Sequence, residues 1–596
     1  MHIIIMCIQY GGDAMPAKSS GEVKTRTINR TQKNGDIYVL ERRIIYDPTL
    51  KRNKILNTKL MHKIPKGSSI PVPTRPKRSY FEKSSDFDEQ IVAKRTRIGM
   101  MDILSHIGTS SKIDSGIYGS TDIGTAQKII SIARYFLASN GQTLPGILPW
   151  QLNHQLPYED GITEDVYHDL FVQVGRNETL QQNFFANRCE SIKEKVVLAY
   201  DSSTISTYSE NQIEARYGYN KAEDGLKTIK YLTLYSIDAR QPVAFTKQPG
   251  NLADVITIEN ALHQLSALGI KDAELVTDNG YYSEHNLAEL FLAGFDFITL
   301  VKTSAAWVRR EMDKHLDELD SLGSVCPFDT STHGITVSLM RSFVKVRKYD
   351  NHKTGSKKGD EETFQRRVYL HLYRNAERRA EENKRFDEDL LELRRVIEEG
   401  TNVKDLPGSV QKKVAKYLYV SKRGGCIRVT FNEVNCKTAK KYHGFFSITS
   451  NKEKNTFECL CKYRKRETIE SYFEAMKYRV DGLRPRVWRA DTLRGRMFVQ
   501  FVALCYYEYL SNEIRNMKQI LGIKNGNPAH DTAENLALEK KLKRWLENTP
   551  LYVVLQWFDT IESTTVTSRL KSKRWSTEVT KRDNLFLQYL GVKMTN

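Results

Sequence analysis

The sequence predicts an α/β fold in which a mixed β-sheet is flanked by helices. Two short apolar runs, residues 195–200 and 274–277, have the length and composition of buried strands. Each run is followed at once by a carboxylate, Asp201 in the first case and Asp278 in the second. Strand-like and helix-like segments alternate around these two runs, which is the pattern of a layered α/β domain.

The predicted elements of this sheet follow in the order strand, strand, strand, helix, strand, helix, strand. In open α/β sheets ligands gather near strand ends, so Asp201 and Asp278 are expected to converge on one crevice. Taken alone, Asp278-Asn279-Gly280 is more often a turn that caps a helix, and only together with Asp201 and Glu470 does it favour a metal site. After Asp201 we predict strands at residues 228–237 and 242–246, a helix at 252–268, the strand ending at Asp278, a helix at 283–293 and a strand at 295–301.

The chain before the first aspartate has two parts of different composition. Residues 1–95 are basic and rich in turn-forming residues, with strand-like runs at residues 36–46 and 51–60. Prolines 65, 71, 73 and 76, interspersed with lysine and arginine, then predict an extended linker. Residues 96–192 are predicted to be helical, because residues 125–137 place their apolar side chains on one face.

Four polar residues further along the chain share one face of a predicted helix. Tyr463, Arg466, Glu470 and Lys477 stand at offsets 0, 3, 7 and 14. At about 100° per residue these positions lie within roughly 60° of one another. The set suits a metal-bound phosphate, with Glu470 on the metal and the two cations on phosphate oxygens. For any single Glu–Arg pair the alternative is a solvated charged face.

With Asp201 in YDSST and Asp278 in TDNGYY, the chain resembles the DDE transposases of bacterial insertion sequences, which have an RNase H-like core. The Y-(2)-R-(3)-E-(6)-K spacing is similar to the signature of the insertion-sequence-four superfamily. Further matches are the P-G-N turn at residues 249–251 and the G-F-F and T-S-N segments between 444 and 451. The resemblance covers about residues 100–515. One departure is the pair of tyrosines after Asn279-Gly280, where many relatives carry a basic residue and then an aromatic one.

The resemblance implies a catalytic triad of Asp201, Asp278 and Glu470 that holds two Mg²⁺ ions, for which Mn²⁺ substitutes. Three neighbouring carboxylates without a cation would repel one another and raise their pKa values. Paired divalent ions suit phosphoryl transfer because they stabilise both the attacking and the leaving oxygen. Tyr463, Arg466 and Lys477 are then expected to bind DNA phosphate.

The implied function is cut-and-paste DNA transposition, with cleavage at the element's ends, a hairpin intermediate and strand transfer into target DNA. The implied partners are double-stranded DNA, as terminal inverted repeats and as target, and a second copy of the chain. Two alternatives stay open: an RNase H-like nuclease without strand transfer, and a transposase-derived DNA-binding protein without activity. The expected location is the bacterial cytoplasm, in association with the nucleoid.

The resemblance also divides the chain into regions. Residues 1–95 are expected to recognise the transposon end, 96–192 to be a helical region and 516–596 a C-terminal helical region that can dimerise. The catalytic core is split into residues 193–302 and 441–515, because the gap between Asp278 and Glu470 is too long for an ordinary connection. The intervening residues 303–440 are expected to form a β-rich insertion, with strands at 336–346, 366–373 and 414–420 and a charged helix at 375–399.

The composition agrees with a nucleic-acid partner. The 91 Lys and Arg residues exceed the 72 acidic ones, giving a net charge of +19 that favours binding to phosphate. No apolar run reaches the length of about 18 residues that predicts a membrane span. No G-x-x-x-x-G-K-[ST] loop is present, so an ATP motor is not indicated.

The remaining sequence features predict no further site. The eight cysteines are scattered, and Cys459-x-Cys461 lacks the second pair that a zinc site needs, so free thiols are expected. The apolar opening segment lacks the basic residues that begin a signal peptide. Met15 is an alternative start to Met1.

Overall fold

The computed structural model describes residues 23–47, 52–68, 71–73, 92–192, 196–218, 220, 223–346, 350, 357–423, 426–568 and 571–594. Met15, the opening segment and Pro76 of the predicted linker lie outside the described residues. The chain divides into two compact units, Met1–Asp86 and Phe87–Asn596.

The first unit contains one antiparallel sheet with the strand order β1-β2-β3-β4. The two strands expected at residues 36–46 and 51–60 are present as β2 and β3, and β1 precedes them without having been predicted. Val39 and Ile44 are buried, whereas most side chains of β1 and β3 are exposed. The strands are β1 Val23–Thr31, β2 Ile37–Asp47, β3 Arg52–Ile64 and β4 Val72–Pro73.

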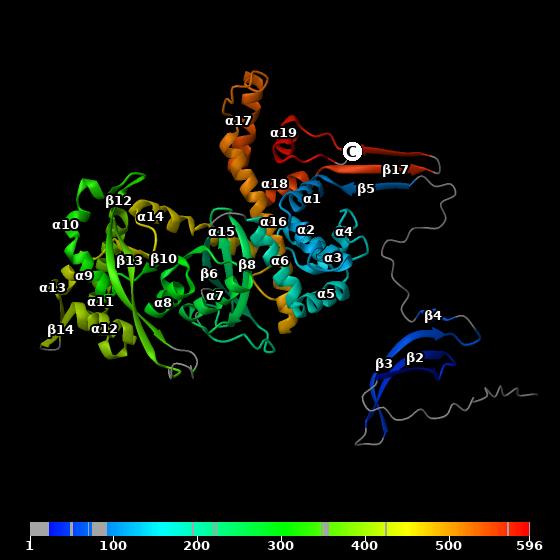
Figure 1. The fold of residues 1–596 in the computed structure, drawn as a ribbon, viewed down its shortest axis with the longest axis horizontal. Helices are drawn as coiled ribbons and strands as arrows, with labels where there is room; N and C mark the ends of the chain where they lie inside the picture. The colour runs from blue at the N-terminus through cyan, green and yellow to red at the C-terminus, as the bar shows by residue number, and fades with distance from the viewer. Residues whose placement is uncertain are drawn as a thin grey trace, which may run out of the picture. The chain divides into compact units, whose positions relative to one another are not determined.

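The second unit is built on a nine-stranded mixed sheet, flanked by helices, with the order β11-β12-β13-β16-β10-β9-β6-β7-β8 (Figure 1). β6 is parallel to β9 and β9 is parallel to β10, whereas the neighbours on either side are antiparallel. This confirms the expected mixed α/β fold and the expected adjacency of the strands that precede Asp201 and Asp278. The strands are β6 Val196–Thr207, β7 Lys227–Ser236, β8 Gln241–Pro249, β9 Ala273–Thr277, β10 Asp296–Val301, β11 Val325–Cys326, β12 Asp329–Val346, β13 Glu361–Asn375 and β16 Phe445–Ser450.

The insertion between the core strands adds to the core sheet. β12 and β13 form a long hairpin, and β13 pairs with β16, which itself pairs with β10. The charged helix expected at residues 375–399 is present as α11, with ion pairs between residues four apart such as Arg378–Glu382. The other helices of this segment are α9 Ala306–Lys314, α10 Leu316–Leu319, α12 Gly408–Tyr417 and α13 Glu433–Lys441; α11 spans Ala376–Glu398.

The prediction of a strand at residues 414–420 is wrong for residues 414–417, which are helical. α12 runs to Tyr417, and only then does β14 (Leu418–Arg423) begin, paired with β15 (Cys426–Phe431). Val410 and Val414 stand four residues apart and pack with Ile397 of α11 in one apolar cluster. The helical spacing of these two valines therefore decides the structure of a run that looks strand-like by composition.

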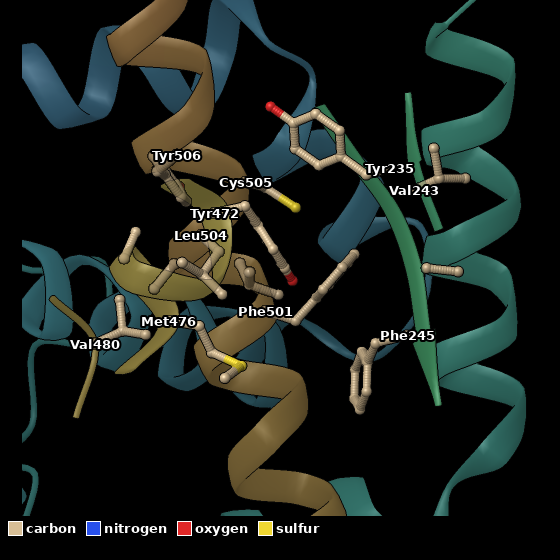
Figure 2. Close-up of a cluster of buried hydrophobic side chains, with 14 of the residues drawn as sticks. Tyr235, Val243, Phe245, Tyr472, Met476, Val480, Phe501, Leu504, Cys505 and Tyr506 are labelled. Atoms are coloured by element: carbon tan, nitrogen blue, oxygen red, sulfur yellow. The ribbon is translucent and has the colours of Figure 1, made fainter. Parts of the chain in front are cut away.

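The helical region expected at residues 96–192 surrounds the long helix α16. Residues 497–510 in the middle of α16 are mostly buried and pack on the core sheet. Figure 2 shows Phe501, Leu504 and Cys505 of α16 lying with Tyr472 and Met476 opposite the strand residues Tyr235, Val243 and Phe245. The helices are α1 Gly99–Ser110, α2 Ile113–Tyr118, α3 Ile123–Ala138, α4 Ile147–Gln151, α5 Glu164–Arg176, α6 Glu178–Ser191, α7 Ile258–Ala267, α8 Glu284–Ala293 and α16 Ala490–Ile520.

The C-terminal region differs from the all-helical expectation. It contains α17 (Ala533–Asn548), α18 (Leu551–Phe558) and α19 (Lys581–Leu590), but also the strands β17 (Glu562–Ser568) and β18 (Lys571–Ser576). β17 pairs on its other side with β5, Val92–Arg97, so the order is β18-β17-β5. The last residues of the predicted N-terminal region therefore belong to the second unit.

Two further findings concern the part of the chain that the structure describes. None of its helices combines the length and the apolar character that crossing a membrane requires. Cys189, Cys326, Cys436, Cys459, Cys461 and Cys505 are free thiols.

Candidate active site

Asp201 and Asp278 lie side by side where the parallel pairing of two strands ends. The last paired residues of β6 and β9 are Tyr200 and Thr277, and each aspartate is the next residue in its chain. β9 ends there, whereas β6 continues to Thr207 against β7, so Asp201 is within its strand rather than at the strand end that was expected. The carboxylate oxygens accept the backbone N–H groups of the following residues, at 2.8 Å for Asp201 and 2.7 Å for Asp278.

The single helix expected from Tyr463 to Lys477 is wrong. The structure has two helices, α14 (Thr456–Lys465) and α15 (Thr468–Tyr478), separated at Arg466 and Glu467. The backbone tightens at this point: the N–H groups of Arg466 and Ile469 each donate to the carbonyl three residues earlier, at 3.0 and 2.9 Å. Spacing of this kind is that of a 3₁₀ turn, which often marks functional positions inside helical segments.

The turn directs the Arg466 side chain onto three carboxylates. Its guanidinium is 2.8 Å from Asp201 Oδ2 through Nη1, and through Nη2 it is 3.6 Å from Asp278 Oδ2 and 3.9 Å from Glu470 Oε1. The Tyr463 hydroxyl donates to Asp278 Oδ1 at 3.2 Å. The structure thus brings together five of the six residues that the sequence singled out.

Exposure increases across this group from the cation to the last carboxylate. The Arg466 side chain is 9% exposed, Asp201 19%, Asp278 43% and Glu470 68%. Burial lowers the pKa of Arg466, but Tyr463 and the three carboxylates outweigh it and hold the pKa above its ordinary value. Burial also raises the pKa of Tyr463. The hydroxyl therefore stays protonated and acts as a hydrogen-bond donor.

Lys477 lies on α15, seven residues after Glu470, and is half-buried. Seven residues are about two helical turns, so the two side chains lie on the same face of α15, about two turns apart along the helix axis. Lys477 therefore extends the polar face of this helix away from the carboxylates.

Three residues that support the site were not singled out from the sequence. Ser202 follows Asp201 in β6, and its hydroxyl donates to Asp254 Oδ1 at 2.8 Å. The same oxygen accepts from the buried Lys230 Nζ at 2.6 Å. This network fixes the residue next to Asp201. A signal was present, because Asp254 comes three residues after the P-G-N turn that carried part of the family resemblance.

The glycine of that turn has a steric role. A Cβ built on Gly250 would lie 2.0 Å from the carbonyl oxygen of Thr228, so no other residue fits without moving β7. The close approach brings the following segment, with Asp254, onto the sheet beside Asp201.

The donor set fits divalent cations that prefer oxygen ligands. The three carboxylates converge on one cation in this structure, the Arg466 guanidinium, which stands at the point where positive charge is needed. The buried Nε of Arg466 has no hydrogen-bond partner among the described residues, so one hydrogen-bond donor of the guanidinium is left without an acceptor. Carboxylate oxygens of this kind are the usual protein ligands of Mg²⁺.

A second group of ligand-type residues lies on α7 and α8. Glu259, His285 and Glu289 have donor atoms within 4.8 Å of one another, and this is the one such group among the described residues. His285 Nε2 is 3.1 Å from Glu259 Oε1, and both side chains are more than a third exposed. Hydrogen bonding between exposed groups accounts for this cluster without a metal.

One comparison with known proteins identifies the family of this chain. The sequence model of the family described as Transposase DDE domain matches residues 192–506, which include all six predicted site residues. A solved structure titled "Cryo-EM structure of piggyBac transposase synaptic complex with hairpin DNA" covers 77% of this chain and 81% of that chain, at 7% identity and a TM-score of 0.32. A similarity of this extent carries no argument about fold or function. Among curated proteins none matches the sequence.

Proposed function

The chain belongs to the Transposase DDE domain family, and we propose that it moves a bacterial insertion sequence by cutting at its ends and joining them to target DNA. The single observation that carries the proposal is the convergence of Asp201, Asp278 and Glu470 on Arg466. Three carboxylates from two neighbouring strands and one helix gather there, and such a site demands a cation.

The cations that we assign to this site are two Mg²⁺ ions, for which Mn²⁺ substitutes. Asp201, Asp278 and Glu470 would hold them, and when bound the ions supply the Lewis acidity that phosphoryl transfer needs. The strand residues give the site its rigidity, because Asp201 and Asp278 are each fixed by a backbone N–H. Glu470 is the most exposed of the three carboxylates.

Arg466, Tyr463 and Lys477 are assigned to the DNA backbone next to the scissile bond. A guanidinium binds phosphate through two parallel hydrogen bonds, which a lysine cannot reproduce. Arg466 leaves the carboxylates to make this contact, and its unpartnered Nε favours the exchange, because a buried unsatisfied donor costs about 1–3 kcal/mol. Tyr463, protonated at all physiological pH values, orients a phosphate oxygen by donating its hydroxyl proton.

Within the family we place the chain in the insertion-sequence-four superfamily, on the Y-R-E-K spacing of residues 463, 466, 470 and 477. A hairpin intermediate, a homodimer in the synaptic complex and a nucleoid-associated cytoplasmic location are part of the same proposal. So is the division into an end-recognising region at 1–95, a helical region at 96–192, a core at 193–302 and 441–515 around an insertion at 303–440, and a dimerising region at 516–596.

The test uses the full chain, Mg²⁺ and a linear DNA that carries the inverted repeats flanking the gene, together with a circular target plasmid. Cutting at the repeat ends followed by joining to the plasmid is the expected result. Cutting without joined products would instead favour a nuclease. Absence of any Mg²⁺-dependent cutting, with DNA binding retained, would favour an inactive DNA-binding protein and sink the proposal.

A further inference from the structure

A polar cavity of ≈ 300 Å³ lies on the flank of the catalytic helix α15, away from the three carboxylates. Thr468, Ser471, Glu474 and Ala475 of α15 line it. The first, second and fourth of these positions are about 100–160° around the helix from Glu470, and Glu474 is about 40° from it. The remaining walls come from the end of β7, the turn before β8 and the helix α16. One helix therefore contributes a residue to the catalytic site and a wall to this cavity.

Three arginines from three elements line the cavity: Arg240 before β8, Arg479 after α15 and Arg515 on α16. Within the described part of the chain, none of the three has a carboxylate at ion-pair distance, although most other arginines of the core are paired. Arg479 donates to Asn140 Oδ1 at 3.2 Å and lies over the ring of Tyr552. Unpaired guanidinium groups beside hydroxyl donors form a site for an anion with several oxygens.

The carboxylates of the cavity do not cancel this charge. Glu508 on α16 is buried and accepts a hydrogen bond from the Tyr235 hydroxyl at 2.8 Å. Burial raises the pKa of Glu508 to about 7, against the opposing effects of that hydrogen bond and of Arg240. Glu474 is the other carboxylate in the lining, and its side chain is exposed.

The cavity continues along α16 into a second one of ≈ 390 Å³ that shares Tyr507, Ser511 and Arg515 with it. Lys518 adds a fourth cation, and Glu547 is the carboxylate of this part. From Tyr507 to Lys518 the groove follows α16 for about 16 Å, at 1.5 Å per residue. That length corresponds to roughly four or five nucleotides of one DNA strand, at about 3.4 Å of helix axis each.

We infer that this groove along α16 binds the phosphate backbone of duplex DNA beside the cleavage site, with Arg240, Arg479, Arg515 and Lys518 as phosphate ligands. The inference rests on the proposed function, since it names a further contact of the same DNA. Its position beside the cleavage site follows from α15, because this helix carries Glu470 and also supplies one wall of the cavity. Backbone contacts of this kind set the position of DNA without reading its sequence.

The experiment measures binding of the full chain to a labelled duplex of arbitrary sequence between about 50 and 200 mM salt. The variant Arg240→Gln/Arg515→Gln should weaken binding at least about tenfold at fixed salt. It should also lower the slope of log affinity against log salt by about 2, since each lost phosphate contact removes about 0.9. The matched control is Arg385→Gln/Arg395→Gln, which removes the same charge from α11, where both arginines are paired within the helix. The control should leave the slope unchanged.

Three outcomes would overturn the inference. Equal slopes for the groove variant and the control would mean that the arginines do not meet DNA. Unaltered DNA binding together with stabilisation of the unaltered chain by inorganic phosphate would make the groove a small-anion site. If the double variant does not fold, as seen by circular dichroism, Lys518→Gln in the second cavity is measured instead, and an unchanged slope there would have the same meaning.

Failure of the proposed function has a different result. In that case the unaltered chain would not cut DNA with Mg²⁺, while its DNA affinity would still depend on Arg240 and Arg515. If the inference alone fails, the unaltered chain cuts and the salt slope does not change in the variant.

Discussion

The two sides of α15 have opposite electrostatic designs. On one side, three carboxylates, Asp201, Asp278 and Glu470, surround the single guanidinium of Arg466. On the other, the guanidinium groups of Arg240, Arg479 and Arg515 line a cavity with one buried carboxyl, that of Glu508. The first site attracts cations and the second attracts anions, and both are built on the same eleven-residue helix.

The difference shows how one rigid element serves two requirements of DNA cleavage. A phosphodiester repels carboxylates, so a site made only of carboxylates would reject its own substrate unless cations are supplied there and nearby. The α15 helix is held in place by buried side chains, including Tyr472 (Figure 2). The hydroxyl of Tyr472 lies 2.9 Å from that of Tyr231. This packing fixes the distance between the two charge patterns.

The largest effect is expected from the carboxylates themselves. Asp201→Ala, Asp278→Ala and Glu470→Ala should each reduce DNA cleavage to the background of the assay, because each removes a ligand from the proposed metal site. DNA binding should be retained, since the groove on the other side of α15 is unchanged. Cleavage of end-labelled DNA and binding of the same DNA are measured side by side.

The matched control for this prediction is Glu467→Gln. Glu467 is three residues before Glu470, is exposed, and lies at the break between α14 and α15. This variant should keep cleavage close to that of the unaltered chain. More than a few per cent of activity in one of the three alanine variants would remove that residue from the triad.

A smaller loss is expected for the cations of the catalytic face. Arg466→Ala and Lys477→Ala should each raise the barrier to cleavage by about 1.5–3 kcal/mol, the value of a charge-assisted hydrogen bond to phosphate. Metal affinity should not fall in either variant. In Arg466→Ala it should rise, because the guanidinium that contacts all three carboxylates is gone.

Titration of Mg²⁺ into the full chain by calorimetry checks this prediction. A large loss of metal binding in Arg466→Ala would mean that the side chain holds the turn between α14 and α15 in place and that its role is structural. Lys477→Ala is the comparison, since Lys477 lies about two turns from Glu470 and does not border the break.

The buried carboxyl on the opposite side should produce a pH-dependent change in stability. Because the pKa of Glu508 is raised to about 7 in the folded chain, the folded state binds more protons than the unfolded state between about pH 4.5 and 7. Stability therefore falls as the pH rises through this range, by about 3 kcal/mol at most. Glu508→Gln should remove this loss and raise the melting temperature at pH 8 relative to the unaltered chain.

Arg240, Arg479, Arg515, Glu474 and Tyr235 face the same cavity, so a general effect of charge has to be separated from that of Glu508. Glu547→Gln, at an exposed position of the neighbouring cavity, is the control and should leave the pH profile unchanged. An identical pH profile for Glu508→Gln and the unaltered chain would show that Glu508 is ionised throughout the range.

Much of the catalytic core was predictable because its signals are local. Short apolar runs ending in Asp201 and Asp278 predicted two buried strands, and the periodicity of the chain between them predicted the helices. Their placement side by side came from the family resemblance, since strand order depends on contacts that no local pattern encodes. The same holds for β12 and β13, whose pairing with the core sheet through β16 was not visible in the sequence.

The signature segment shows where periodicity misleads. The spacing of Tyr463, Arg466 and Glu470 correctly predicts that the three side chains meet, but a single straight helix does not bring them together. The 3₁₀ turn at Arg466 does, and it is formed by hydrogen bonds to the third rather than the fourth residue back. The arginine cavity was missed for a similar reason, because Arg240, Arg479 and Arg515 are far apart in the sequence and meet only through packing on α16.

The smallest effect on stability is expected from removing the N-terminal unit, which tests whether end recognition is separate from both sides of α15. The region boundary expected from the sequence would place the cut after residue 95, but β5 pairs with β17, so a cut there removes most of an edge strand of the second unit. Deleting residues 1–86 follows the division of the chain instead and should leave the melting temperature nearly unchanged. The shortened chain should still bind DNA through its groove, with the same salt slope, and should lose its preference for the element's own end over a scrambled duplex.

Binding to both duplexes is compared at one fixed salt concentration, because the non-specific phosphate contribution varies steeply with salt. If the shortened chain distinguishes the two duplexes as well as the full chain does, the end is recognised by the second unit, and the four-stranded sheet of the first has another role.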